Sequence, residues 1–476
     1  MRSKDSIGKI RLVCDEVLRR AVPTEDEREE TVSFSQETVK RLAEELRRSS
    51  IEAGVQVQGS MAKDTWLAGE KDIDVFILLP PTYERDDFPR VLEVVKRVAG
   101  KDWLEAYAEH PYIQADIDGY TIDFVPAFKI EKAEEARSSV DRTPLHTQYV
   151  NGHLSQEIRN EVRLLKRFMH GTGTYGAEIK VGGFSGYLCE ILVLYYGSFY
   201  KTLKAASRWR KGQVIDVKRY YEGLEEEARK IFQDNLIVVD PVDKGRNVAS
   251  AVREGRLSEF LVAARWFLEK PDIEFFYPSE TIPLSSDELS QTMHHRGSAF
   301  IFLKFGSARV VPDILWGQLY KSLKAVGKLI RRHDFNILRS DVWSDEKTTN
   351  VFLFELESHI LPPVKRHLGP PLEKEEECVR FLNKHLGSDR TISGPYIEND
   401  RWIVEVRRAY TDIVSLIRDE LKDGGRKIGI ANTVSKALAN QFDVLLNEKI
   451  TGLYRSNHEF AKFLTEYLKG KPRWLR

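Results

Sequence analysis

The sequence has little of what marks secreted, membrane-spanning or zinc-knuckle proteins. Its 476 residues include only three cysteines and no CxxC pair, which excludes a disulfide framework and a cysteine-based zinc site. No apolar run is long enough to span a membrane, since the longest, Tyr187 to Tyr196, is interrupted by Glu190. The first residues also lack an apolar stretch of signal-peptide length. We therefore expect a reducing, cytoplasmic location and no membrane partner.

A net charge is missing as well. The 73 Lys and Arg residues balance 73 Asp and Glu residues, so any affinity for a polyanion must come from local segregation of charge. Two segments show it: residues 201–220, where Trp209 and Tyr220 stand among lysines and arginines, and residues 451–476. Such segments are typical of RNA-binding surfaces with aromatic rings available for stacking, and equally of a solvated helix or a frayed terminus.

The chain has enough apolar material for several cores. Hydrophobic residues make up 42% of it, and its length corresponds to about three domains at roughly 150 residues each. Surface helices are expected over residues 1–50, followed by an α/β block to about residue 125 and a helical stretch over residues 156–206. Strand-like runs then recur between helical stretches, which indicates an α+β C-terminal half; these are Ala299 to Phe305, Val351 to Leu356 and Trp402 to Val406.

Two carboxylates on one apolar strand are the sharpest local feature. Asp72 and Asp74 alternate with Ile73 and Val75, so in a strand both acids point to one face. A divalent cation between them would relieve their repulsion, and a third acid, Asp123, lies in another strand-like run. The alternative is a solvated strand edge. The preceding Gly59-Ser60 turn opens a helix, whose free N–H groups could hold phosphate.

A basic stripe is expected on the helix that starts near residue 156. Arg159, Arg163, Lys166 and His170 recur at helical spacing, opposite the apolar face. The stripe predicts either a phosphate-facing surface or a solvated helix face.

Several motifs together resemble a known family. In chain order they are GSMAKDTWLAGEKDIDVFILLP (59–80), YAEHPY (107–112), IDFVPAF (122–128), VDRTPLH (140–146), EVRLLK (161–166), YGAEIKVGGFSGYLCE (175–190), VVDPVDKGRNVA (238–249), RGSAFIFLKF (296–305) and PYIENDRW (395–402). They are similar to segments of the archaeal, class I CCA-adding tRNA nucleotidyltransferases of the polymerase β superfamily. The resemblance covers most of the chain, whereas the first motif alone would indicate only a nucleotidyltransferase.

The resemblance implies an α+β multidomain fold with three parts. These are a polymerase-β-like nucleotidyltransferase head (1–143), a helical domain that binds the nucleotide and primer (144–268) and an α+β tRNA-binding body and tail (269–476). It also implies a set of catalytic acids that hold Mg²⁺: Asp72, Asp74 and Asp123. The residues that it implies for nucleotide binding are Ser60, Lys63, His146, Lys166, Tyr175, Arg246, Tyr107 and Ala108. Lys63 stands where some relatives carry Arg, so its charge is kept but the bidentate fork is lost.

The activity implied is the template-independent addition of C, C and A to the tRNA 3′ end from CTP and ATP, by two-metal nucleotidyl transfer. The implied partner is tRNA, held at its acceptor and T arm, and dimers occur among relatives. Two other hypotheses stay open at this point. One is a poly(A) polymerase or another terminal nucleotidyltransferase with the same acids, and the other is an RNA-binding module whose acids are vestigial.

Overall fold

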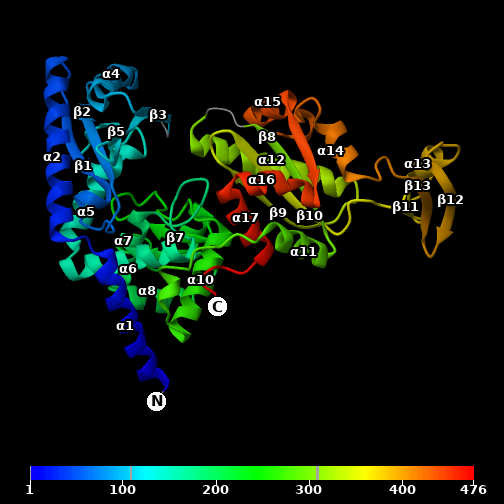
Figure 1. Ribbon diagram of the computed structural model, residues 1–476, viewed down its shortest axis with the longest axis horizontal. Helices are drawn as coiled ribbons and strands as arrows, with labels where there is room; N and C mark the ends of the chain where they lie inside the picture. The colour runs from blue at the N-terminus through cyan, green and yellow to red at the C-terminus, as the bar shows by residue number, and fades with distance from the viewer. Residues whose placement is uncertain (1, 108–109, 307–309, 476) are drawn as a thin grey trace. The chain divides into compact units, whose positions relative to one another are not determined.

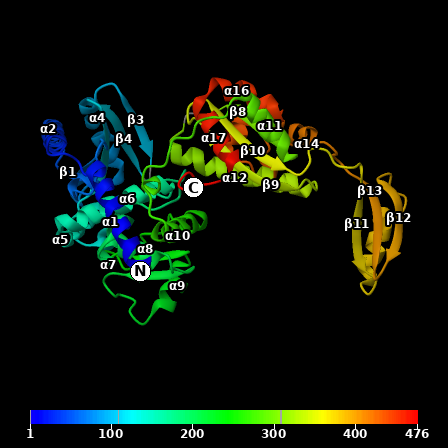
Figure 2. The same cartoon turned by 60° about the horizontal axis from the view of Figure 1, so that its bottom comes forward.

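The computed structural model describes residues 2–107, 110–306 and 310–475, without the side chains of residues 2–6 and 107. The chain divides into two compact units (Figures 1 and 2). Unit 1 comprises residues 1–280 and 472–476, and unit 2 comprises residues 281–471. Among the described helices, none is both long and apolar enough to cross a membrane.

The first sheet of unit 1 has five strands in the order β1-β2-β5-β4-β3. Strands β1, β2, β3 and β5 are labelled in Figure 1. The central strands β2 and β5 run parallel, and the other pairs are antiparallel. Apolar side chains of α2 and α4, such as Leu42 and Val95, form a core with Val75 and Phe124 of the two central strands. The elements of this part are α1 (Arg2–Ala21), α2 (Glu25–Arg48), β1 (Gly54–Gln58), α3 (Gly59–Ala62), β2 (Asp72–Leu79), α4 (Phe88–Ala99), β3 (Trp103–Tyr107), β4 (Pro111–Ile117) and β5 (Tyr120–Phe128).

The rest of unit 1 is mainly helical and packs around one aromatic side chain. Phe168 lies within 6.2 Å, between ring centroids, of five other phenylalanines. A short parallel pair of strands, β6 and β7, was not expected from the sequence. The elements are α5 (Thr143–His153), α6 (Gln156–Thr172), α7 (Gly186–Tyr196), α8 (Phe199–Ala206), β6 (Gln213–Asp216), α9 (Glu225–Phe232), β7 (Leu236–Val239) and α10 (Glu254–Glu269).

The described residues of unit 2 form two antiparallel sheets. The first sheet has the order β14-β8-β10-β9. The second has the order β11-β13-β12, and Figure 2 shows these strands side by side. The helices of the unit are α11 (Ser286–Arg296), α12 (Pro312–Arg332), α13 (Glu375–His385), α14 (Ile413–Leu421), α15 (Asn432–Asn440), α16 (Thr451–Ser456) and α17 (His458–Lys469). Its strands are β8 (Ala299–Gly306), β9 (Ile337–Ser344), β10 (Thr349–Leu356), β11 (Val364–Pro371), β12 (Thr391–Glu398), β13 (Arg401–Arg407) and β14 (Phe442–Leu446).

The α+β multidomain fold predicted from the sequence is confirmed. Each of the three strand-like runs beyond residue 270 lies within a strand, namely β8, β10 and β13. The division into three parts at residues 143 and 268 stays a prediction.

Candidate active site

The three predicted catalytic acids lie on one face of the first sheet. Asp74 of β2 stands opposite Asp123 of β5 in the parallel register, and Asp72 precedes Asp74 by two residues. Ile73 and Ile122, which alternate with these acids, are almost fully buried on the core face of the sheet. Because side chains alternate along a strand, the burial of the isoleucines directs the carboxylates to the opposite face.

Burial and mutual repulsion raise the pKa values of the acids. The pKa of Asp123 rises to about 6, chiefly through burial, although a hydrogen bond from Gln114 Nε2 (2.9 Å) opposes the rise. The charges of Asp74 and Asp72 add to it. Burial also raises the pKa of Asp74, to which the charge of Asp72 contributes, and burial raises the pKa of Asp72. The charges of Lys63 and Lys166 oppose the rise at Asp74 without cancelling it.

The donor set fits a divalent cation. Carboxylate oxygens are the ligands that hard cations such as Mg²⁺ prefer, and a cation would offset the repulsion that raises the pKa values of Asp74 and Asp123. In the part of the chain that the structure describes, no group of three or more His, Cys, Asp or Glu side chains is already arranged to hold a metal ion. The three carboxylates would therefore have to turn toward one another to share one.

A glycine brings the backbone of the Gly59-Ser60 turn against Asp74. Gly59 has φ of +68°, and a Cβ added to it would collide with the Asp74 carboxylate. Only glycine fits this position, since it has no Cβ to collide with Asp74 and adopts positive φ without strain. Ser60, the next residue, is half-buried in the single turn of α3. This predicted phosphate-binding residue thus lies beside the acids.

The basic stripe of α6 binds the loop that follows α3. Arg159 Nε donates to Lys63 O at 3.0 Å and Lys166 Nζ to Thr65 O at 2.9 Å, while Arg163 donates to Asp64 O and Trp66 O at 2.8 and 2.9 Å. Four successive carbonyls of residues 63–66 are satisfied in this way.

The alternative of a solvated helix face is therefore wrong for Arg163 and Lys166, whereas the phosphate-facing role of Lys166 stays a prediction. Arg163 is 0% exposed and Lys166 is 1% exposed. Both side chains are buried because the loop carbonyls need donors once they are removed from water.

Two predicted nucleotide-binding lysines meet at one buried carboxylate. Glu190 Oε2 accepts a hydrogen bond from Lys63 Nζ at 2.6 Å, and Glu190 Oε1 lies 3.8 Å from Lys166 Nζ. Thr65 Oγ1 donates to Glu190 Oε1 at 2.6 Å. Glu190 was not among the site residues predicted from the sequence. Its signal was present, because it is the one charged residue in the apolar run of α7.

A second buried carboxylate gathers two further predicted residues. Asp240 Oδ2 lies 2.9 Å from His146 Nε2 and 2.7 Å from Arg246 Nη1, and Asp240 Oδ1 accepts from the Tyr187 hydroxyl at 3.0 Å. The His146 ring stacks on Tyr187 at 4.1 Å between centroids. Asp240 was also missed, although an acid that directly follows the buried strand β7 was a usable signal.

The pKa values of this cluster define its charges. Burial alone would raise the pKa of Asp240, but the hydrogen bond from His146 and the charge of Arg246 outweigh it and lower the pKa to about 2. Burial lowers the pKa of His146 despite the nearby carboxylate. A neutral imidazole therefore donates from Nε2 to an ionised Asp240.

Tyr175 lies close to Lys166. A Cβ added to Gly186 would lie 3.0 Å from the Tyr175 hydroxyl and 3.4 Å from Lys166 Nζ, so both groups flank the same glycine. The Tyr175 ring stacks on His170 at 4.0 Å, and burial raises the pKa of its hydroxyl, which is therefore neutral. Tyr107 ends β3, but its side chain and the whole of Ala108 lie outside the described residues.

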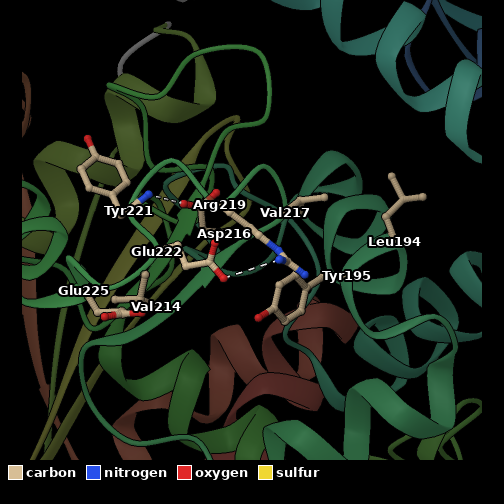
Figure 3. A pocket seen from close by; sticks show the side chains of 9 residues that line it. All are labelled: Leu194, Tyr195, Val214, Asp216, Val217, Arg219, Tyr221, Glu222 and Glu225. Carbon is tan, nitrogen blue, oxygen red and sulfur yellow. Dashed lines mark hydrogen bonds and ion pairs between the residues drawn. The ribbon is translucent and has the colours of Figure 1, made fainter.

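The predicted basic segments offer fewer aromatic rings than expected. Trp209 is 5% exposed and donates to the Tyr196 hydroxyl at 3.1 Å, so the expectation that it stacks on RNA is wrong. Tyr220 is 43% exposed. A cavity of about 630 Å³ opens beside this segment, where Arg219 pairs with Glu222 at 3.5 Å (Figure 3). Its described lining includes none of the predicted site residues.

Three family models match successive parts of the chain. The nucleotidyltransferase domain matches residues 39–146, the second domain of tRNA nucleotidyltransferase matches residues 160–277, and the C-terminal domain of the CCA-adding enzyme matches residues 296–447.

Curated relatives match nearly the whole chain. The CCA-adding enzyme of Methanothermobacter thermautotrophicus is 37% identical over 457 residues, and that of Methanosarcina mazei is 36% identical over 458. Each alignment covers 95% of this chain and 97% of the relative. Among solved structures, a Cid1 poly(U) polymerase aligns with 17% identity and a TM-score of 0.45, covering 55% of this chain and 96% of that one. That likeness is too distant to bear on function.

Proposed function

The chain belongs to the archaeal CCA-adding enzymes, the class I tRNA nucleotidyltransferases with a polymerase-β-like domain, and from this premise we propose how its residues act. Its function is the addition of CCA to the 3′ end of tRNA. The substrates that this function implies are tRNA, CTP and ATP. The residue roles below, and the order and template independence of the additions, are the proposal.

Asp72, Asp74 and Asp123 are the proposed catalytic acids. The single observation that carries this assignment is the register that sets Asp74 beside Asp123, with Asp72 on the same face. The superfamily typically uses a divalent metal, and these three carboxylates would hold Mg²⁺. When bound, a pair of such ions supplies Lewis-acid activation of the RNA 3′-hydroxyl and neutralises charge on the departing pyrophosphate. The acids themselves orient the reacting groups, and no nucleophilic side chain is required.

Ser60, Lys63, Lys166 and Tyr175 form the proposed triphosphate site. The proximity of Lys63, Lys166 and Tyr175 around Glu190 and Gly186 supports this grouping. Two ammonium groups bind phosphate oxygens as point charges, and the neutral Tyr175 hydroxyl can donate a hydrogen bond.

His146 and Arg246 form the proposed second part of the nucleotide site. Their shared contact with Asp240 supports this pairing, because a buried carboxylate fixes both side chains. Arg246, which is about one-third exposed, would reach a phosphate from there. Tyr107 and Ala108 would shape the base pocket.

Sequencing the product of one reaction tests the proposal. A tRNA that lacks its terminal CCA is incubated with the protein, Mg²⁺, CTP and ATP, and the extended 3′ end is read. We expect addition of C, C and A in that order and then termination, without a nucleic-acid template. An open-ended tail of A would instead identify a poly(A) polymerase. Homodimerisation and a cytoplasmic location stay predictions.

A further inference from the structure

Glu190 is a fully buried carboxylate that the proposed chemistry does not use. It is 0% exposed, and its two oxygens contact the side chains of Lys63, Thr65 and Lys166. The two lysines are themselves buried, with exposed fractions of 6% and 1%. The carboxylate therefore makes no contact with solvent. Two of its three partners, Lys63 and Lys166, are residues proposed to bind the triphosphate.

Glu190 is the carboxylate that pairs with both ammonium groups, at 2.6 Å from Lys63 Nζ and 3.8 Å from Lys166 Nζ. Each buried ion is costly without a partner, so this pairing stabilises both lysines in the interior. Burial lowers the pKa of Lys166, the nearby charge of Lys63 lowers it further, and the charges of Glu190, Cys189 and Glu70 oppose this. Without Glu190, two buried ammonium groups would face each other, so one would lose its proton or turn away.

The cluster joins three separate elements. Lys63 and Thr65 lie in the loop after α3, Lys166 lies on α6 and Glu190 lies on α7. The Thr65 hydroxyl accepts from Lys166 Nζ at 3.1 Å and donates to Glu190 at 2.6 Å, which connects the second lysine to the carboxylate. A hydrogen-bonded network of this kind fixes the distance between the two ammonium groups.

We infer that Glu190 is a positioning residue of the triphosphate site, which holds the ammonium groups of Lys63 and Lys166 together so that both can bind one anion. This inference rests on the proposed function, since it assumes that the two lysines bind the triphosphate. It differs from a purely structural role in one respect. Loss of the carboxylate should weaken binding of a triphosphate anion beyond any effect on folding.

Calorimetric binding of inorganic tripolyphosphate to the full-length protein in EDTA tests the inference. EDTA removes divalent cations, so the measured Kd depends on the lysines and not on a bound metal. We expect Glu190→Gln to raise the Kd about tenfold and Thr65→Val to raise it about threefold, because each removes hydrogen bonds to charged groups. In turnover assays the KM for both CTP and ATP should rise by similar factors, with kcat and the Kd for tRNA changed less than twofold.

Glu355→Gln is the matched control. Glu355 is a 1% exposed carboxylate in unit 2 that also pairs with two cations, Arg296 and Arg339. This variant should lower the thermal midpoint as Glu190→Gln does, but leave the Kd for tripolyphosphate unchanged.

The outcomes separate this inference from the proposed function. Wild-type or tighter tripolyphosphate binding by folded Glu190→Gln would overturn the inference, provided that Lys63→Ala and Lys166→Ala weaken binding. If these two lysine variants also bind as wild type, the proposed triphosphate site is wrong. Should Glu190→Gln fail to fold, Thr65→Val decides, since valine replaces threonine without changing its shape, and unchanged binding by that variant would refute the inference.

Discussion

Asp74 on β2 stands directly opposite Asp123 on β5, across a parallel pair of strands. The two acids are 49 positions apart in the chain, so their proximity depends on how the strands pair in the sheet. With the apolar neighbours of both residues buried, the carboxylates must share the other face.

Replacing Asp123 should stop both nucleotide additions. We expect Asp123→Ala to lower the rate of C and A incorporation by about 1,000-fold or more, since a metal-holding carboxylate is lost. The Kd for tRNA should stay within a few-fold of wild type. Single-turnover incorporation and filter binding measure the two quantities. Asp102→Ala, which removes an exposed acid next to β3, is the control. Unchanged turnover in Asp123→Ala would refute the assignment of the acids.

Adding one methyl group at Gly59 should displace Asp74. Gly59→Ala places a Cβ against the Asp74 carboxylate at a backbone with φ of +68°. We expect activity to fall about 100-fold, which is typical of a misplacement near 1 Å in an active site. Gly69→Ala separates the two causes, because Gly69 has φ of +83° but no atom within 4 Å of an added Cβ. Equal losses in both variants would show that backbone strain alone is responsible.

Removing Asp240 should cost stability in a way that depends on pH. The pKa of Asp240 is lowered from 3.8 to about 2, so the ionised carboxylate stabilises the fold above about pH 4. This contribution, about 2 kcal/mol for a shift of that size, is lost as the pH falls from about 4 to 2. Urea unfolding of Asp240→Asn and wild type between pH 2 and pH 7 measures it. A difference in unfolding free energy that stays constant over this range would contradict the assigned pKa.

Arg163 should matter for stability and not for tRNA affinity. Arg163→Leu leaves the carbonyls of Asp64 and Trp66 without their donor, and we expect a loss of about 3 kcal/mol, as for a broken buried charge pair. The salt dependence of tRNA binding should not change, because the Arg163 guanidinium already donates to Trp66 O, Asn160 Oδ1 and Asp64 O. Lys204 lies in an exposed part of the basic segment 201–220. We expect Lys204→Ala to make the negative slope of log K for tRNA binding against log salt concentration shallower by about 0.7 to 0.9. A lower slope in Arg163→Leu would contradict the burial argument.

Much of the fold could be predicted from local patterns. The alternation of Ile73 and Val75 with two acids defined β2 and its polar face, and the helical spacing of residues 156–170 defined α6. The short strands β6 and β7 were not predicted, because four-residue strands give too little periodicity to be distinguished from loops.

The sequence by itself determined which residues carry charge and on which side of a strand or helix they lie. Only the tertiary structure decided which charges meet. Lys63 and Glu190 are 127 residues apart, His146 and Asp240 are 94 apart, and the arginines of α6 turn inward to loop carbonyls. The physical reason is that side-chain direction follows local backbone geometry, whereas a buried ion takes whatever partner the packing of distant elements brings within hydrogen-bond distance.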